Sequence, residues 1–167
     1  MIKPVFLNGD CTYPIGDGIK IIAHIVNNRG SFGKGFVTAI SKKSKFPEIE
    51  YKKWYKNGIY LDQPFALGNI QIIPISHDIA VSNMIAQDGY FSTFNPVPCQ
   101  YNALEQCLIK LVDYIKTFGV EKKVSIHIPY LMGCGLGHGN WELVLSILIT
   151  FICENDINLY IYNFNIT

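Results

Sequence analysis

Residues 30–35 read Gly30-Ser31-Phe32-Gly33-Lys34-Gly35, and residues 133–139 read Gly133-Cys134-Gly135-Leu136-Gly137-His138-Gly139; these two stretches decide the fold. Each follows an apolar, strand-like run and precedes an amphipathic, helix-like run. Glycine lets the backbone take positive φ angles and lets another group approach closely. A helix that begins after such a loop offers unpaired N–H groups to an anion. Together the two stretches predict a ligand with two linked phosphates, although either one alone could be only a tight turn.

The rest of the chain alternates strand-like and helix-like runs, which predicts an α/β fold. Most strand-like runs are apolar almost throughout, as in strands covered on both faces; they are Pro4–Leu7, Ile19–Val26, Asn69–Ile75, Ile79–Ala86, Val124–Ile128 and Leu159–Tyr162. The helix-like runs are Gly35–Ser44, Pro47–Tyr55, Tyr101–Phe118 and Trp141–Cys153. We expect one domain over residues 1–167, with three α/β/α layers and a mixed, mostly parallel six-stranded sheet. Ligands of such sheets bind at the carboxyl ends of the strands, where both glycine stretches lie.

Four residues are expected to mark helix ends. Pro47 suits the first position of its helix, and Gly58 follows the end of the same helix. Gly119 is expected just beyond the end of the helix that starts at Tyr101. Asn140 is a good N-cap for the last helix.

Composition and charge exclude several classes of protein. The chain is 49% hydrophobic and 16% charged, so disorder is not expected. The longest apolar stretch, Leu143–Cys153, is too short to span a bilayer, and the N-terminus lacks the apolar run of a signal peptide, so we expect a cytoplasmic protein. The net charge of +1 with scattered basic residues predicts no affinity for duplex nucleic acid. Five cysteines and four histidines without metal-ligand spacing predict no metal site.

Polar side chains follow three of the predicted strands. Asp10 could accept a hydrogen bond from an exocyclic amine or a ribose hydroxyl, or it could only stabilise an Asx turn. Asn27 and Asn28 could reach sugar hydroxyls, or they could be turn formers. Gln87 and Asp88 are the polar groups after another strand that could act near a bound sugar.

The histidines and cysteines offer few candidates for catalysis. His138 is the histidine expected to face a ligand, and its ordinary pKa of about 6.5 suits acid–base work, although an exposed loop histidine without such a role is the alternative. His24 and His127 lie within strand-like runs and are expected to be structural. Cys134 could be a nucleophile, but no histidine is evidently placed to activate it.

These motifs, in this order, resemble the macro domain. The matching residues are Asn8-Gly9-Asp10, Ile22 to Asn28, Gly33 to Val37, Phe46-Pro47-Glu48 with Tyr51, Leu67-Gly68-Asn69, Ile128-Pro129, Gly133 to Leu136, and Trp141. The resemblance extends over about residues 5–164. It is greatest to the branch containing the terminal ADP-ribose protein glycohydrolase and the antitoxin that removes ADP-ribose from DNA.

The resemblance implies that ADP-ribose or a derivative is the ligand. Asp10 would bind the adenine amine, with Cys11 as a neighbouring backbone contact and Asn163 near the adenine. Asn28 would approach the distal ribose, and Gln87 and Asp88 would lie close to it. One phosphate and the distal ribose would be wrapped by Gly33, Lys34, Gly35, Phe36 and Val37. The diphosphate would be held by backbone N–H groups of Gly133, Cys134, Gly135, Leu136, Gly137, His138 and Gly139.

The match is weakest at the catalytic positions of that branch. Its enzymes use a nucleophilic lysine where this chain has Gln87, and an acidic residue where it has Gly137. A different hydrolysis could use Asn28 or Asp88 to position a water, or His138 as a base. The substrates that fit the resemblance are an ADP-ribosyl ester of protein or nucleic acid, O-acetyl-ADP-ribose, which would make the enzyme a deacetylase, and ADP-ribose 1″-phosphate.

Two other functions remain open at this point. The protein could be a non-catalytic reader or sponge of ADP-ribose or a related NAD-derived nucleotide, or it could bind a different nucleotide. In each case we expect a monomer that requires no cofactor and has no membrane partner.

Overall fold

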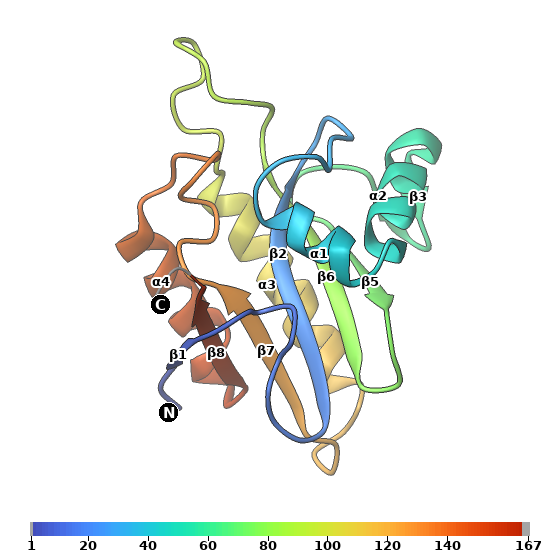
Figure 1. Cartoon of the computed structure of the whole chain (residues 1–167), viewed down its shortest axis with the longest axis vertical. Helices are drawn as coiled ribbons and strands as arrows, with labels where there is room; N and C mark the ends of the chain where they lie inside the picture. Colours follow the sequence, from blue (N-terminus) through green and yellow to red (C-terminus); the bar gives the residue numbers. More distant parts are fainter. Residues whose placement is uncertain (1, 165–167) are drawn as a thin grey trace.

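Six strands form one sheet at the centre of the computed structural model, which describes residues 2–164 (Figure 1). They are β1 (Val5–Asn8), β2 (Ile19–Asn27), β5 (Ile70–Pro74), β6 (Ile79–Gln87), β7 (Val124–Pro129) and β8 (Asn158–Asn163). The order across the sheet is β1-β8-β7-β2-β6-β5. All neighbours are parallel except β5 and β6, which are antiparallel. The predicted mixed, mostly parallel sheet is confirmed.

Helices cover both faces of this sheet and complete the three layers (Figure 1). The helices α3 (Tyr101–Lys116) and α4 (Trp141–Phe151) bury their apolar faces with the sheet in one core cluster. On the other face, α1 (Phe36–Lys43) and α2 (Phe46–Asn57) contribute to a second core cluster. Both glycine stretches connect a strand to a helix, as predicted.

The structure corrects some predicted helix ends. The α3 helix ends at Lys116, two residues before the predicted Phe118. The α4 helix ends at Phe151, and the short 3-10 helix η1 (Cys153–Asn155) follows it. Pro47 is the second residue of α2, because that helix begins at Phe46. The cap of α4 is confirmed, since the Asn140 side chain accepts a hydrogen bond from Leu143 N at 3.2 Å.

The structure also contains a small hairpin that the sequence pattern did not predict. It consists of β3 (Ile59–Tyr60) and β4 (Gln63–Pro64), which pair antiparallel. Trp54 Nε1 of α2 donates a hydrogen bond to Gln63 O at 2.8 Å, and the Trp54 ring is buried against Phe65. Tyr60 of the hairpin and the adjoining Phe65 therefore pack against the second core cluster.

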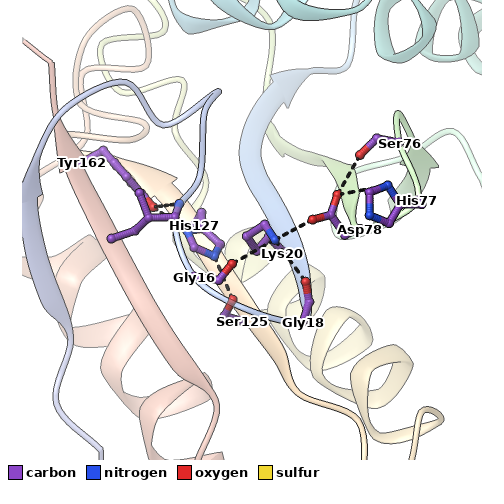
Figure 2. Close-up of polar contacts among 10 residues, drawn as sticks. Gly16, Gly18, Lys20, Ser76, His77, Asp78, Ser125, His127 and Tyr162 are labelled. Atoms are coloured by element: carbon purple, nitrogen blue, oxygen red, sulfur yellow. Dashed lines mark hydrogen bonds and ion pairs between the residues drawn. The ribbon is translucent and has the colours of Figure 1, made fainter.

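The connection from β1 to β2, residues 9–18, crosses the sheet without a helix (Figure 2). Tyr162 OH accepts a hydrogen bond from Ile15 N at 3.1 Å and also bonds to His127 Nδ1 at 2.7 Å. Lys20 Nζ donates to Gly16 O and Gly18 O, each at 3.1 Å. Buried side chains of the sheet thus hold this segment in place where a helix would otherwise pack. Among the described residues, no helix combines the length and apolar character needed to cross a membrane.

Candidate ligand-binding site

The two glycine loops meet at the carboxyl ends of the strands. We call residues 28–35, between β2 and α1, the first glycine loop, and residues 130–139, between β7 and α4, the second glycine loop. A Cβ atom built on Gly35 would lie 3.3 Å from Leu136 Cδ1, so the loops touch there. Gly35 has a φ of 81°, which glycine adopts without strain. The sequence pattern placed both loops at this edge of the sheet, and the structure brings them into contact.

The first glycine loop is anchored by two side chains. Tyr51 OH donates to Asn27 O at 2.6 Å and accepts from Gly30 N at 3.1 Å. Asn27 Oδ1 accepts from Arg29 N at 2.8 Å and from Ser31 N at 3.3 Å. These contacts hold the first half of the loop as a fixed turn.

The second half of the first glycine loop and the first two residues of α1 leave backbone donors free. Within residues 2–164, the amide N–H groups of Gly33, Lys34, Gly35, Phe36 and Val37 donate to no protein acceptor. Gly35 is the N-cap of α1 and provides no side-chain cap for that helix. Because these donors lie at the positive end of a helix, they can bind an anionic group.

The second glycine loop folds back on itself. Gly139 N donates to Gly133 O at 2.9 Å, and His138 N donates to Gly135 O at 3.1 Å. The amides of Gly135, Leu136 and Gly137 find no acceptor in the part of the chain that the structure describes. Both loops therefore present unpaired N–H groups near their point of contact.

The glycines of the two loops differ in whether the surrounding protein leaves room for a side chain. A Cβ atom on Gly137 would lie 2.6 Å from Gly133 O, and one on Gly139 would lie 2.8 Å from the same oxygen. A Cβ atom on Gly33 or Gly135 would meet nothing within 4 Å. Packing of the loop therefore accounts for glycine at 137 and 139, but it does not account for glycine at 33 and 135.

Asn28 and Asp88 lie side by side, although 60 residues separate them in the chain. Asn28 Nδ2 donates to Asp88 Oδ1 at 2.9 Å, and Asn28 Oδ1 accepts from Gly89 N at 2.9 Å. The Asn28 amide is therefore engaged by the residues that follow β6. Gln87 also turns to that segment, because its Nε2 donates to Gly89 O at 3.0 Å.

The segment after β6, residues 88–98, forms an arm that contacts both glycine loops. In Figure 1 it is the yellow-green loop that rises above the sheet. The hydroxyls of Tyr90 and Ser31 share a hydrogen bond. The rings of Phe91 and His138 stack with centroids 4.0 Å apart and an interplanar angle of 14°. An open pocket of about 700 Å³ lies along this arm, lined in part by Arg29 and Asp88.

Asp10 and its neighbours lie at the ends of β1 and β8. Asp10 Oδ1 accepts from Thr12 N at 2.9 Å and from Thr12 Oγ1 at 2.7 Å, which is the Asx turn that the sequence allowed. Cys11 is buried, and burial together with the charge of Asp10 raises the pKa of its thiol. Gly9 N donates to Asn163 O at 3.0 Å, which ties the two strand ends together.

The cysteine and the two strand histidines of the sequence analysis have structural surroundings. Burial raises the pKa of the half-buried Cys134 thiol, which disfavours the nucleophilic thiolate. His24 is buried and bonds through Nε2 to Asn83 Oδ1 at 2.6 Å. His127 bonds to Ser125 Oγ at 2.8 Å as well as to Tyr162. Burial lowers the pKa of each histidine to about 4.

Sequence reasoning missed the side chains of Arg29 and Ser31 as neighbours around the site, whereas Tyr90 was expected as one of the aromatic residues that could cover a ligand. Arg29 looked like one of many scattered basic residues, and its position directly after Asn28 was the available signal. Among the described residues, no group of three or more His, Cys, Asp or Glu side chains could hold a metal ion.

Known proteins resemble this chain in sequence and in fold, although no protein-family model matches it. A protein of unknown function from Bacteroides thetaiotaomicron is 38% identical, covers 97% of this chain and 98% of its own, and has a TM-score of 0.87. A macrodomain protein from Streptomyces coelicolor is 30% identical, with 96% of this chain and 98% of that chain covered and a TM-score of 0.79.

Two further relatives carry names that mention a ligand, and a third does not. An ADP-ribose 1″-phosphate phosphatase from Candida albicans is 27% identical over 154 residues, which is 87% of this chain and 92% of that protein. Thermosipho africanus DarTG in complex with ADP-ribose has a TM-score of 0.66 at 16% identity, over 87% of this chain and 38% of that chain, and shows a shared fold alone. An uncharacterised 17.5 kDa protein of Enterobacteria phage T4 is 34% identical over 70 residues, so the match spans 40% of this chain and only 42% of that protein.

The mixed sheet with helices on both faces places this protein in the three-layer α/β class. The 30% identity to the Streptomyces protein over nearly all of both chains defines the class further: the chain belongs to the macrodomain family. The resemblance noted in the sequence is confirmed.

Proposed function

We propose that this macrodomain binds ADP-ribose or a derivative where the two glycine loops meet, and that it hydrolyses an ADP-ribosyl derivative. The observation that carries the proposal is the set of unpaired amides on both loops, at a point where the loops touch. A diphosphate offers acceptors to both sets of donors at once. The names of the Candida phosphatase and of the Thermosipho complex support ADP-ribose as the diphosphate.

Gly33 and Gly135 add support to this proposal. Neither has a positive φ, and a methyl group on either would meet nothing in the protein. Glycine at these positions is explained if a ligand lies against the backbone there.

The remaining polar groups suggest how the site would act. Asp10 would contact the adenine, with Cys11 and Asn163 beside it, through the part of the Asp10 carboxylate that Thr12 does not engage. Asp88 is our candidate for the group that positions a water, because Asn28 Nδ2 donates to its carboxylate and holds it in place. His138 is the alternative base, although its ring is stacked on Phe91. Compact derivatives such as O-acetyl-ADP-ribose and the 1″-phosphate, and ADP-ribosyl esters, are the substrates to screen.

A non-catalytic reader is the second candidate. The side-chain amides of Asn28 and Gln87, near the expected distal ribose, both form hydrogen bonds to the arm. Because these bonds serve the structure of the protein, they favour a site that binds without catalysis. A reader would need only backbone donors and the adenine contact.

Calorimetric titration with ADP-ribose, with AMP and ADP as controls, tests binding. We expect micromolar affinity for ADP-ribose and weaker binding of both controls. Gly33→Ala and Gly135→Ala should each weaken ADP-ribose binding at least tenfold without lowering the unfolding midpoint. Unaltered affinity in both variants, or no binding by the wild type, would reject the proposed site.

Turnover of the three substrate classes separates enzyme from reader. If the protein is an enzyme, Asp88→Asn should abolish turnover and retain ADP-ribose binding, and His138→Gln tests the alternative base in the same way. Turnover that survives in both variants would exclude both proposed bases. Binding without turnover of any substrate would favour the reader.

A further inference from the structure

The arm is firmly built at its base and lightly attached at its sides. Asp88 N donates to Pro98 O at 2.8 Å, which closes the base of the arm. Asn95 Nδ2 donates to Asp88 O at 2.8 Å and to Tyr90 O at 2.9 Å, so one side chain spans the arm from inside. Ser92 and Asn95 exchange backbone hydrogen bonds at 3.1 and 3.0 Å, which form its tip. The arm thus has its own framework.

Beyond the bonds of Asn28 at the base of the arm, two side-chain contacts tie this framework to the glycine loops. Tyr90 reaches Ser31 of the first loop, and Phe91 reaches His138 of the second. Consecutive residues of the arm therefore bridge two loops that lie on opposite sides of the expected diphosphate. We call these two contacts the clasp. Tyr90 and Phe91 are 52% and 54% exposed, so the clasp can open without disturbing the core.

The clasp lies beside the group of residues expected at the distal ribose. Asp88 and Gly89, which bond to Asn28, directly precede Tyr90 and Phe91 in the chain. A group attached to the distal ribose would therefore leave the site next to the clasp. This step rests on the proposed function, which places the distal ribose near Asn28.

We propose that Tyr90 and Phe91 are specificity-determining residues of this site. With the clasp closed, the site admits ADP-ribose whose distal end is free or carries a compact group such as an acyl ester or a phosphate. An ADP-ribosyl group attached to a polypeptide is admitted only when the clasp opens. The clasp thereby selects small ADP-ribose derivatives over modified proteins.

Binding of two probes tests this selection. One probe is ADP-ribose, and the other is a short peptide carrying one ADP-ribosyl group through a non-hydrolysable linkage. The wild type should prefer free ADP-ribose. Phe91→Ala, Tyr90→Phe and Ser31→Ala should each shift the ratio of the two dissociation constants about three- to tenfold toward the peptide, since exposed stacking and hydrogen-bond contacts are of that strength.

Two controls keep the test specific. Thr93→Ala changes an exposed residue at the tip of the same arm and should leave the ratio unchanged. Tyr90→Phe and Ser31→Ala remove the same hydrogen bond from opposite ends, so the double variant should match either single variant. Additive effects would mean that the two hydroxyls act separately, which contradicts the clasp.

The outcomes distinguish the two proposals. An unchanged ratio in all three clasp variants, with ADP-ribose binding intact, overturns the selection and leaves the proposed function standing. Absence of ADP-ribose binding by the wild type overturns the proposed function and the selection with it. Thermal unfolding of each variant checks that the fold is retained.

Discussion

The two ends of the sheet differ in whether the protein itself provides hydrogen-bond partners for their polar groups. At the amino end, Lys20 Nζ has three acceptors, Asp78 Oδ2 at 2.8 Å and the carbonyls of Gly16 and Gly18 (Figure 2). At the carboxyl end, the two glycine loops leave amides without acceptors among the described residues. An ammonium group has three donors, so Lys20 is fully satisfied within the protein. The difference teaches that the charged group at the amino end is satisfied within the protein, whereas the two glycine loops at the carboxyl end keep amides that a ligand could use.

The largest loss of stability is expected at low pH, where two buried histidines of the sheet, His24 in β2 and His127 in β7, must become protonated. The pKa of His24 and that of His127 are each lowered from 6.5 to about 4 by burial. Between these values the unfolded chain binds more protons than the folded one. Stability therefore falls as the pH drops below about 6.5, and the loss is complete below about 4, at about 3 kcal/mol for each histidine.

Urea unfolding between pH 7 and pH 4 measures this loss. His127→Gln should remove about half of the pH dependence, whatever it does to stability at pH 7. His77→Gln is the matched control, because the His77 side chain is 92% exposed. A pH profile that is flat above pH 4.5 in the wild type would contradict the buried neutral state of both histidines.

Within the second glycine loop, Gly135 and Gly137 look alike in the sequence but differ in their surroundings, so they allow a direct comparison of ligand binding with stability. Gly137→Ala should destabilise the protein by about 2–3 kcal/mol, because the new methyl group would lie 2.6 Å from Gly133 O. Gly135→Ala should leave stability unchanged or raise it by up to about 1 kcal/mol, since nothing is within reach and the unfolded chain loses freedom.

Paired measurements of unfolding and ADP-ribose binding test this difference. The Gly135 variant should lose affinity with its fold intact, whereas the Gly137 variant should lose stability as well. Equal loss of stability in both would show that the fold requires glycine throughout this loop.

Substitution of Lys20 at the amino end of the sheet should lower the unfolding free energy by less than Gly137→Ala. Lys20→Met should cost about 1–2 kcal/mol of unfolding free energy, because removing the ammonium group of this 6% exposed side chain leaves its acceptors unpaired. Lys52→Met, which breaks the exposed pair with Glu48 on α2, should cost less than about 0.5 kcal/mol. ADP-ribose affinity should be retained in both, as measured by calorimetry; a loss of affinity in the Lys20 variant would show that the two ends are coupled.

Much of the fold was predictable because its strands are long, apolar and separated by clear turn residues. The order of the strands was not, since the pairing of β1 with β8 joins opposite ends of the chain and no local pattern records it. The β3–β4 hairpin was missed because each strand has only two residues, and because its hydrogen bond with Trp54 is a tertiary contact.

The position of the candidate site on the sheet was predictable from the sequence, whereas the contacts between its side chains were not. Glycine spacing placed both loops at the carboxyl ends of the strands. The Asn28–Asp88 and Phe91–His138 contacts join separate loops, so they depend on how those loops fold over one another. The distinction between Gly135 and Gly137 was also hidden, because it depends on which atoms surround each Cα.

The hydrogen bonds of Asn83 have a spectroscopic consequence. Asn83 Nδ2 donates to Pro47 O and to Gln71 Oε1, so Asn83 Oδ1 must be the acceptor in the bond with His24 Nε2. The ring proton of His24 is thereby fixed on Nε2 and shielded from exchange with water. The rings of Phe32 in the first glycine loop and of Phe36 at the start of α1 lie 5.7 and 5.8 Å from the His24 ring. The nuclear magnetic resonance of that one proton will therefore report, through ring-current shifts, any displacement of the loop when a ligand arrives.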